Sequence, residues 1–367
     1  MLSLQEIITA TGGHCENMQE LIFTGITTDS RIESSGELFV ALCGERFDGH
    51  AYCKMALEHG AALVSKPVPE LPSETVIITV EDTLLAYQQI AHAYRMSNKN
   101  LKVVAVTGSN GKTSTKDMIA ACLSTKFKVI KTQENFNNEI GLPKTLLSVK
   151  ADTEIAVVEM GMRGLGQIRE LCDIAKPDVA VVTNVGETHM ELLGSMENIA
   201  RAKSELVEDL TQEQLAVLNA DNEYVAAMAD KTKAQVVTYG YSGKATFRGD
   251  NVVTTAHGSV FTCIDSRSGE RTEVNMPLTI LDYMALENAV ITLQYSFMET
   301  YAKNEIEKKY QRDIEYSLLN GLLTGDELSK AARMLKLEDT DQYCVVSFHT
   351  ISSNSEDYYT KEELEEI

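Results

Sequence analysis

Apolar and polar residues alternate along the first part of the chain with two different periods. Short apolar runs at Glu37 to Leu42 and Thr75 to Val80 have the composition of strands, whereas apolar residues from Thr83 to Arg95 recur at helical spacing. This mixture predicts a small α/β domain over residues 1–98. The polar stretch Ser97-Asn98-Lys99-Asn100 follows neither period, so we expect a linker there.

Beyond this linker, near-continuous apolar runs alternate with helical segments. Runs of this kind are typical of parallel strands that are covered on both faces. The runs are LKVVAVTG, KVIKT, EIAVVEMG and PDVAVVTNVG. They predict a doubly wound, mostly parallel sheet over residues 99–278. Within this range, β-branched and glycine-punctuated runs from about 215 to 277 predict an antiparallel appendage.

The pattern changes again after Leu278. From Tyr283 to Leu319 there is no Gly or Pro, and large apolar residues recur at helical spacing among Glu and Lys. We expect one long or broken helix there, a second near Glu327 to Leu337, and a strand in QYCVVSFH. Residues 279–367 are thus predicted to form a helical, incomplete segment. The long helix could pair two chains as a dimer, but packing on its own domain, in a monomer, is the expectation.

Charge and composition limit the partners and the compartment. The 54 acidic and 33 basic side chains give a formal charge of -21, which disfavours nucleic acid and anionic membranes as partners. Any bound phosphate therefore needs a local positive site. There is no signal-like N-terminus, no apolar stretch near the ~20 residues of a membrane span, and no metal-ligand spacing among the seven cysteines. These features predict a cytoplasmic protein without a membrane partner.

The segment Val106 to Ser114 has the residues of an ATP phosphate-binding loop. A glycine-rich turn from strand to helix lets backbone N–H groups face a polyphosphate, and the helix N-terminus adds partial positive charge. Lys112 can reach the terminal phosphates and the Thr113 hydroxyl can bind Mg2+. The predicted nucleotide-binding residues are Gly108, Ser109, Asn110, Gly111, Lys112, Thr113 and Ser114. Because only two residues separate the two glycines, the usual loop pattern is incomplete, and the alternative is a surface turn.

Two further strands end in polar side chains. Glu159 ends IAVVEMG, and the segment Asn184 to His189 ends VAVVTNVGETHM. In open α/β sheets ligands bind outside the carboxyl ends of the strands, so these ends and the phosphate loop are expected to line one crevice. A carboxylate and an imidazole there could hold Mg2+ around ATP. Taken singly, each residue could equally be structural or solvated.

These segments resemble the Mur ligases of peptidoglycan precursor synthesis. TGSNGKTST, Glu159, TNVGETHME, RAKSEL and LNADN match the central ATPase domain of that family, and ITTDSRIESSGELFVALCGERFDGHAY is similar to its UDP-sugar domain. Within the family, NFNNEIGLPKTLL and VVEMGMRGLGQI look like the members that add D-alanyl-D-alanine to UDP-N-acetylmuramoyl-tripeptide. The resemblance covers about residues 1–278. A folylpolyglutamate synthase is disfavoured by the UDP-sugar segment.

The resemblance implies a role for individual residues. The implied catalytic residues are Lys112, His189 and Lys203. Lys203 occupies the place of a lysine that several members carry as a carbamate; the alternative is an exposed helix lysine. The implied metal ligands are Thr113, Glu159 and His189, and Asn184 joins the ATP site. The implied substrate-binding residues are Asp29, Ser30, Arg31, Asp48, Gly49, His50, Asn137 and Asn138.

The implied reaction uses ATP and Mg2+ to turn the terminal carboxylate of the tripeptide into an acyl phosphate. The amine of D-alanyl-D-alanine then attacks it, releasing phosphate and leaving an amide. In the family a closing C-terminal domain follows a stretch such as VNMPL, but here TILDYMALENAV follows instead. Residues 279–367 look like a fragment of a PucR-type transcription regulator without its helix-turn-helix.

Two hypotheses therefore stand for the whole chain. The first is the ligase, with amide formation impaired by the missing closing domain. The second is a non-catalytic module that binds nucleotide and UDP-sugar and associates through its helical tail.

Overall fold

The computed structural model describes residues 2–31, 36–44, 47–56, 61–68, 75–255 and 258–277 of the 367-residue chain. The chain separates into two compact units, Met1–Tyr283 and Met284–Ile367. The helices expected at Tyr283 to Leu319 and Glu327 to Leu337 and the strand in QYCVVSFH lie outside the described residues. No helix in the described ranges is long and apolar enough to cross a membrane.

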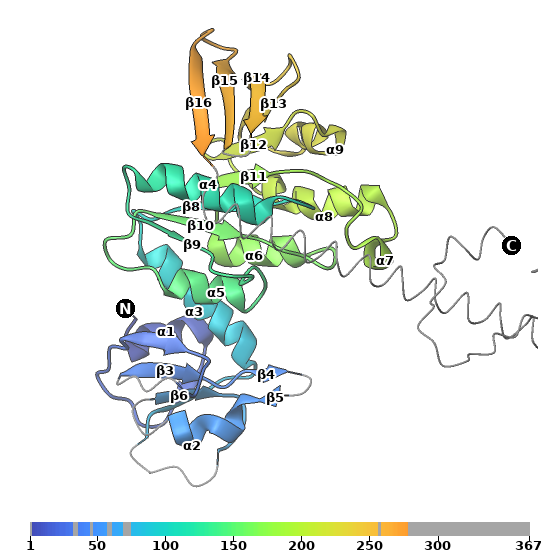
Figure 1. Cartoon of the computed structure of the whole chain (residues 1–367). Helices are drawn as coiled ribbons and strands as arrows, with labels where there is room; N and C mark the ends of the chain where they lie inside the picture. Colours follow the sequence, from blue (N-terminus) through green and yellow to red (C-terminus); the bar gives the residue numbers. More distant parts are fainter. Residues whose placement is uncertain are drawn as a thin grey trace, which may run out of the picture. The chain divides into compact units, whose positions relative to one another are not determined.

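The first sheet is five-stranded and mostly parallel, in the order β1-β7-β6-β3-β2 (Figure 1). Only β1 runs antiparallel to its neighbour. The strands are β1 (His14–Cys15), β2 (Gly25–Thr27), β3 (Glu37–Val40), β6 (Ala61–Val64) and β7 (Ile77–Thr79). The remaining elements are α1 (Leu4–Thr11), the hairpin β4 (Cys43–Gly44) and β5 (Phe47–Asp48), η1 (Gly49–Tyr52), α2 (Cys53–Ala56) and α3 (Thr83–Ser97). The expected strands and helix of this region are confirmed to within two residues.

Side-chain caps fix where the two longer helices of this region begin. The Ser3 hydroxyl accepts a hydrogen bond from Glu6 N, and the Glu6 carboxylate accepts one from Ser3 N, a complete capping box for α1. Asp82 accepts from Leu84 N and Leu85 N at the start of α3. Both helices then bury apolar side chains against the sheet in one cluster with its strands.

The second sheet has nine strands, in the order β16-β15-β14-β13-β12-β11-β8-β10-β9 (Figure 1). The strands are β8 (Lys102–Thr107), β9 (Val129–Lys131), β10 (Ile155–Glu159), β11 (Val179–Val182), β12 (Leu215–Asn219), β13 (Gln235–Gly240), β14 (Phe247–Thr255), β15 (Gly258–Asp265) and β16 (Arg271–Pro277). The helices are α4 (Lys112–Ser124), α5 (Gly141–Leu147), α6 (Gln167–Ala175), α7 (Met190–Leu193), α8 (Met196–Glu208), α9 (Glu223–Ala226) and η2 (Ala227–Lys231).

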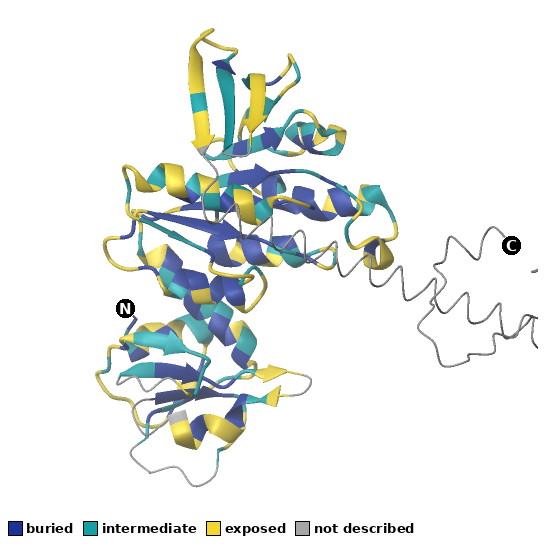
Figure 2. Cartoon of the chain, in the orientation of Figure 1, coloured by how far each residue is buried: buried dark blue, intermediate teal, exposed yellow. Residues whose placement is uncertain are grey.

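Helices cover both faces of this sheet, as the apolar runs predicted. Alternate residues of β8 point to opposite sides: Val104 and Val106 pack with α4, whereas Val103 and Ala105 pack in the cluster that contains α5, α6 and α8. In Figure 2 the central strands are accordingly buried, while β14 and β16 are largely intermediate or exposed. The doubly wound, mostly parallel arrangement is confirmed.

The expected antiparallel appendage is correct only in part. β14, β15 and β16 pair antiparallel, but β12 and β13 are parallel members of the main sheet, next to β11. The prediction that the appendage starts near residue 215 is therefore wrong. Strand composition alone does not separate the two cases, because pairing direction depends on the crossover, here through α9 and η2.

Helix α3 connects the two sheets and packs on α1, α5 and α6. Near its end the buried Arg95 donates hydrogen bonds to the carbonyl of Ala175 (3.1 Å) and to the carboxylate of Asp178 (3.0 Å). The same carboxylate accepts from Val103 N at the start of β8. A buried guanidinium therefore connects α3 to the amino ends of the central strands β8 and β11.

Replacing Arg95 by alanine is expected to lower the free energy of unfolding by about 2–3 kcal/mol, because it removes a buried side chain and leaves the carbonyls of Ala175 and Lys176 without their donor. Asp178 keeps Lys102 and Val103 N as partners. Chemical unfolding measures the loss. Lys102→Ala is the matched control. The Lys102 side chain is 64% exposed and pairs with the same Asp178, so a loss of about 0–1 kcal/mol in the free energy of unfolding is expected. Equal losses in the two variants would contradict the prediction.

Candidate functional site

The predicted phosphate loop lies between β8 and α4 and is held by the segment after β11. Ser109 N donates to the carbonyl of Asn184 (2.9 Å), and Asn110 N donates to the side-chain oxygen of Asn184 (2.9 Å). The Ser109 hydroxyl donates to Gly186 O and accepts from Gly186 N. The Thr183 hydroxyl donates to Asn110 O (2.7 Å). Two strand ends that are far apart in sequence therefore form one rigid turn.

These bonds change which groups can face a phosphate. Because Ser109 N and Asn110 N donate to Asn184, they are not the free donors that the loop pattern suggested. The first turn of α4, with Lys112, Thr113 and Ser114, keeps N–H groups without an intrahelical partner. Gly111 precedes it in the left-handed region at φ 76. The N–H groups that remain available to an anion are therefore those at the start of α4, and Asn184 shapes the loop.

Lys112 lies over the loop. Its Nζ donates to Gly108 O (2.9 Å) and Ser109 O (3.4 Å). Burial lowers the pKa of Lys112, and the nearby Glu159 carboxylate partly offsets this effect. The ammonium is thus bound to backbone carbonyls beside the helix N-terminus, from where it can reach a phosphate.

The Glu159 carboxylate is fixed by hydrogen bonds to both of its oxygens. Glu159 ends β10 and is 3% exposed, and each of its oxygens has a partner: Oε2 accepts from the Thr113 hydroxyl (2.8 Å) and Oε1 from the Asn137 amide (2.8 Å). Mg2+ prefers oxygen ligands and is commonly bound through one or two carboxylates. A buried carboxylate next to a hydroxyl at the start of α4 fits that ion.

His189 and Lys203 complete the group at this end of the sheet. His189 is in the left-handed region at φ 59 and precedes α7; partial desolvation lowers its pKa, as do the charges of Lys203, Lys112 and Arg163. Lys203 projects from α8, is 2% exposed, and makes no hydrogen bond or ion pair within the described part of the chain. Burial, with a contribution from the Lys112 charge, lowers the pKa of Lys203 to about 7.

The other predicted substrate residues lie just after β2, in the β5–η1 segment, or in the loop before α5. Asp29 follows β2 and binds the Arg31 guanidinium through both oxygens (2.8 and 2.7 Å), which lowers the pKa of Asp29 to about 2. Ser30 lies between them. Asn137 contacts Glu159, whereas the Asn138 side chain accepts from Gly141 N (2.9 Å) at the start of α5.

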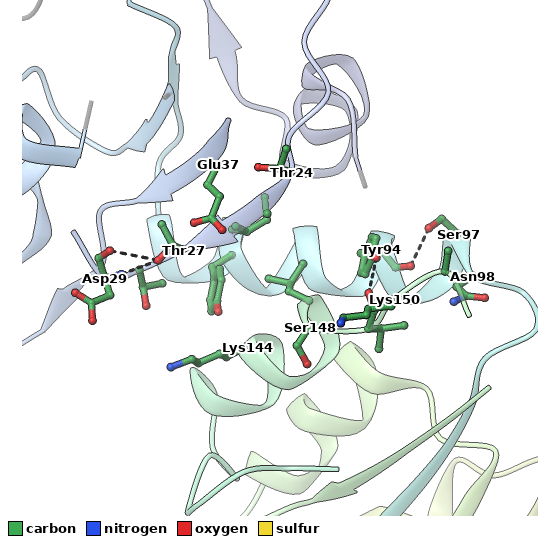
Figure 3. Close-up of a pocket in the computed structure, with 17 residues that line it drawn as sticks. Thr24, Thr27, Asp29, Glu37, Tyr94, Ser97, Asn98, Lys144, Ser148 and Lys150 are labelled. Carbon is green, nitrogen blue, oxygen red and sulfur yellow. Dashed lines mark hydrogen bonds between the residues drawn. The ribbon is translucent and has the colours of Figure 1, made fainter. Parts of the chain in front are cut away.

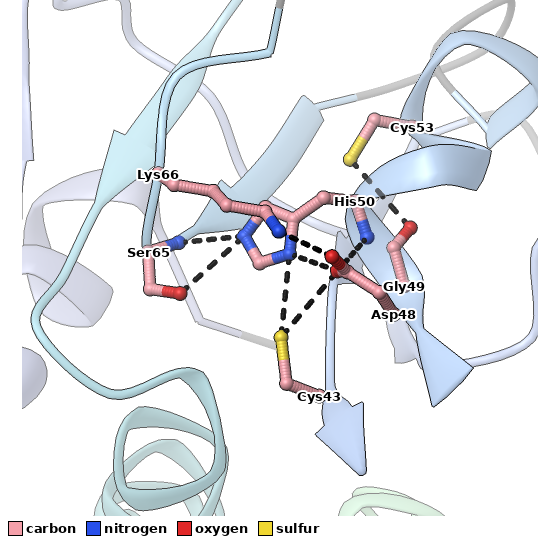
Figure 4. A network of polar contacts seen from close by, with 7 residues as sticks. All are labelled: Cys43, Asp48, Gly49, His50, Cys53, Ser65 and Lys66. Atoms are coloured by element: carbon pink, nitrogen blue, oxygen red, sulfur yellow. Dashed lines mark hydrogen bonds and ion pairs between the residues drawn. The ribbon is translucent and has the colours of Figure 1, made fainter. Parts of the chain in front are cut away.

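A cluster of Cys43, Asp48 and His50 could hold a cation by proximity alone, but its hydrogen bonds oppose this (Figure 4). Ser65 N donates to His50 Nε2 (2.9 Å), so Nδ1 carries the proton that points to Asp48 Oδ1 (2.7 Å). Lys66 already binds the second Asp48 oxygen. His50 is therefore a buried residue with both ring nitrogens engaged, next to Gly49 at the start of η1.

A cavity of about 740 Å³ extends from Asp29 along β2 and is bounded by α3 and α5 (Figure 3). Tyr87 and Tyr94 line the cavity, and the lining residues Lys144 and Lys150 supply positive charge. Asp29 is the only predicted site residue among its lining residues, within the ranges that the structure describes. Lys144 lies in the segment NFNNEIGLPKTLL but was not predicted as a site residue, and no motif identified Lys150 from sequence.

The structure thus brings together one group of predicted residues and leaves the other apart. The loop, Glu159, Asn184, His189 and Lys203 meet at the carboxyl ends of β8, β10 and β11 and on α8, as the strand-end argument predicted. The predicted residues at 29–31 follow β2 of the other sheet, and those at 48–50 lie in β5 and η1. Sequence reasoning missed Thr132, whose hydroxyl accepts from Glu159 N (3.0 Å), and the buried Lys116.

Comparisons with known proteins agree with this geometry. A model of the Mur ligase middle domain matches residues 106–295, and a model of the Mur ligase family catalytic domain matches residues 22–134. The UDP-N-acetylmuramoyl-tripeptide--D-alanyl-D-alanine ligase of Bacillus subtilis is 43% identical over 246 residues, which are 66% of this chain and 53% of the relative. The enzyme of the same name from Synechocystis is 45% identical over 241 residues, 64% of this chain and 53% of the relative.

Solved structures give the same result. MurF from Acinetobacter baumannii superposes with a TM-score of 0.68 at 30% identity, covering 75% of this chain and 60% of that one. The MurF ligase from Thermotoga maritima in complex with ADP has a TM-score of 0.62 at 29% identity, covering 76% of this chain and 65% of that one. The chain spans about half the length of the curated relatives that it matches.

Proposed function

Because the chain belongs to the Mur ligase family, we propose that it is an ATP-dependent carbon–nitrogen ligase that adds D-alanyl-D-alanine to UDP-N-acetylmuramoyl-tripeptide. The observation that carries the proposal is the contact of the Thr113 hydroxyl with the buried Glu159 carboxylate, beside Lys112 at the start of α4. The names of the relatives support the two substrates. The Thermotoga maritima complex supports nucleotide binding.

The residues of this chain would each do one part of the work. The start of α4 and Lys112 bind the phosphates and offset the charge that develops on the transferred phosphoryl group. Glu159, Thr113 and His189 would hold Mg2+, which polarises the phosphate oxygens when bound. The phosphoryl group passes from ATP to the carboxylate of the peptide, and the amine then displaces phosphate from the acyl carbon as it loses a proton.

We assign Lys203 to carbamate formation. Its uncharged Nζ would bond to the carbon of CO2 and release a proton, leaving an anionic group near Lys112 and the metal ligands. A buried lysine suits this reaction because burial lowers its pKa to about 7, so that a large fraction of its amine is uncharged near pH 7, unlike that of an ordinary lysine. The bound anion would also remove the mutual repulsion between Lys203 and Lys112.

Carbon-13 NMR with labelled bicarbonate is expected to give one carbamate signal that grows as the pH rises from below to above about 7. The sign follows from the lowered pKa of Lys203: below it the amine is protonated and unreactive, and above it the amine is free. Lys203→Arg keeps a cation and should lose the signal. A signal that persists in this variant, or that appears only near the pKa of ordinary lysines, would rule out the assignment.

We further propose that the sugar nucleotide binds the first sheet, at Asp29, Ser30 and Arg31 and at the Asp48–His50 turn. The exposed Arg31 guanidinium can bind a phosphate, and the cavity that begins at Asp29 lies between this sheet and α5. Since His50 is internally bonded, its contribution would be to hold Asp48 and the η1 backbone in place. Direct sugar contacts would then come from Asp48, Gly49 and Arg31.

The test is direct. The chain is mixed with UDP-N-acetylmuramoyl-tripeptide, D-alanyl-D-alanine, ATP and Mg2+, and ADP and the pentapeptide product are measured. Formation of both supports the ligase. Since the chain covers about half of its relatives' length, a second function is non-catalytic binding of nucleotide and UDP-sugar. Absence of product with intact binding of both ligands would favour that function, and absence of binding would exclude both.

The described residues end at 277, so the region after residue 278 is known only from its sequence. The middle-domain match runs past Leu278 to residue 295. The resemblance of residues 279–367 to a PucR-type regulator fragment, and a dimer formed through their helices, stay predictions. Light scattering with and without ATP tests the dimer, which a monomer in both conditions would exclude.

A further inference from the structure

Lys116 is a buried cation that the proposed reaction does not use. It lies on α4 one turn after Thr113 and is 3% exposed. Residues three apart in a helix share a face, so both side chains point toward the ends of β9 and β10. Burying an ammonium costs several kcal/mol unless it is paired and hydrogen-bonded, so its presence on this face calls for a specific contact.

The contact is with Thr132, the residue that follows β9. Lys116 Nζ donates to Thr132 O (2.8 Å). The charge is balanced by Asp117, whose carboxylate lies 3.3 Å from Lys116 Nζ and 2.9 Å from Lys131 Nζ. The ammonium is therefore both neutralised and aimed at one backbone carbonyl.

Thr132 in turn holds Glu159. It is 1% exposed, and all three of its polar groups are engaged. Its N–H donates to Val157 O (3.0 Å), its carbonyl accepts from Lys116, and its hydroxyl accepts from Glu159 N (3.0 Å). The backbone N–H of Glu159, the proposed metal ligand, thus donates to Thr132, and Lys116 on α4 donates to the carbonyl of the same threonine.

From these contacts we propose that Lys116 is a positioning residue, which sets the Glu159 carboxylate against the phosphate loop. Two positions of α4 act on the same glutamate: Thr113 bonds its carboxylate, and Lys116 fixes its backbone through Thr132. The inference rests on the proposed function, because it assumes that Glu159 binds the Mg2+ of a Mg2+–nucleotide complex. Lys116 Nζ contacts Thr132 O and the Asp117 carboxylate, so it would act on the metal ligand through Thr132.

A purely stabilising role predicts a different outcome for the same substitution. Lys116→Met keeps the length of the side chain, and the partly exposed Asp117 keeps its ion pair with Lys131 (2.9 Å), so the variant leaves no unpaired buried charge and should keep its fold. Loss of an outer contact to a metal ligand, in contrast, lowers metal affinity by roughly 10-fold to 100-fold. Metal dependence therefore separates positioning from stability.

The experiment measures ADP binding to the full chain by calorimetry, with Mg2+ and with a chelator, in Lys116→Met and Thr132→Val. Both variants are expected to lose at least about 10-fold in affinity with Mg2+ and to keep the metal-free affinity. Lys126→Met, at an exposed position just after α4, is the control and should change neither value. Thermal unfolding is recorded for each variant.

The binding data distinguish a failure of the proposed Mg2+ site from a failure of the proposed role of Lys116. If the wild-type chain binds ADP no better with Mg2+ than without it, the proposed function fails first. If the wild type shows the Mg2+ dependence but Lys116→Met retains it fully, or loses both affinities equally together with a lower unfolding midpoint, Lys116 has no positioning role.

Discussion

Replacing Gly108 by alanine is expected to abolish nucleotide binding. A Cβ at this position would lie 1.9 Å from the Thr183 hydroxyl and 3.2 Å from Asn184 N, and the backbone has φ 155, which favours glycine. The added methyl would separate the loop from the segment after β11, breaking the bonds that hold Ser109 and Asn110. We expect about 3 kcal/mol lower stability, the upper end for overpacking, and at least roughly 100-fold weaker ADP binding.

Calorimetry and thermal unfolding check this prediction, with Gly164→Ala as the matched control. Gly164 lies in the loop between β10 and α6, outside the left-handed region, and no atom lies within 4 Å of an added Cβ. That variant should bind and unfold like the wild type. Normal ADP affinity in Gly108→Ala would mean that the loop does not need its contact with Thr183.

Lys112→Met is expected to weaken ATP binding by roughly 100-fold, about 2.7 kcal/mol, because it removes the cation beside the start of α4 while keeping the side-chain stem. AMP, which lacks the terminal phosphates, should bind equally to both forms. The fold should persist, since burial already disfavours this charge. Lys99→Met, in the exposed linker, serves as the control.

The same variant has an electrostatic signature. The Lys112 charge lowers the pKa of His189 and of Lys203, so its removal should raise both pKa values. NMR titration of the His189 ring measures one of them. An unchanged pKa of His189, together with unchanged ATP affinity, would show that Lys112 points away from the site in solution.

Much of this site could be predicted because its residues follow strands in the sequence. Hydrophobic runs ending in Gly108, Glu159 and Asn184 indicate parallel strands, and parallel strands present their carboxyl ends at one edge. The prediction that the loop, Glu159 and the Asn184 to His189 segment share a crevice needed no further information. The same reasoning could not predict that β12 and β13 join the main sheet as parallel strands. The residue composition of a strand does not determine the direction in which it pairs with its neighbour.

Contacts between side chains separated by many residues were decided only by the tertiary structure. Sequence identified Asn184 as a nucleotide residue, but the fold uses its amide to bond Asn110. It identified His50 as a substrate residue, but packing against Ser65 and Asp48 engages both ring nitrogens. Lys116 and Thr132 had no motif of their own, because their role exists only where α4, β9 and β10 converge.

The sequence by itself determined the position of the glycine-rich loop, the runs that form the central parallel strands and the residue types at their ends, since period and strand-end chemistry are local properties. Which loop N–H groups remain free at the start of α4, how deeply Lys203 is buried, and what holds Glu159 depend on the packing of distant segments. Burial and hydrogen-bond partners set the pKa and the orientation of these groups. The loop could therefore be found by reading the chain, whereas the N–H groups that its internal hydrogen bonds leave available could be found only in the folded protein.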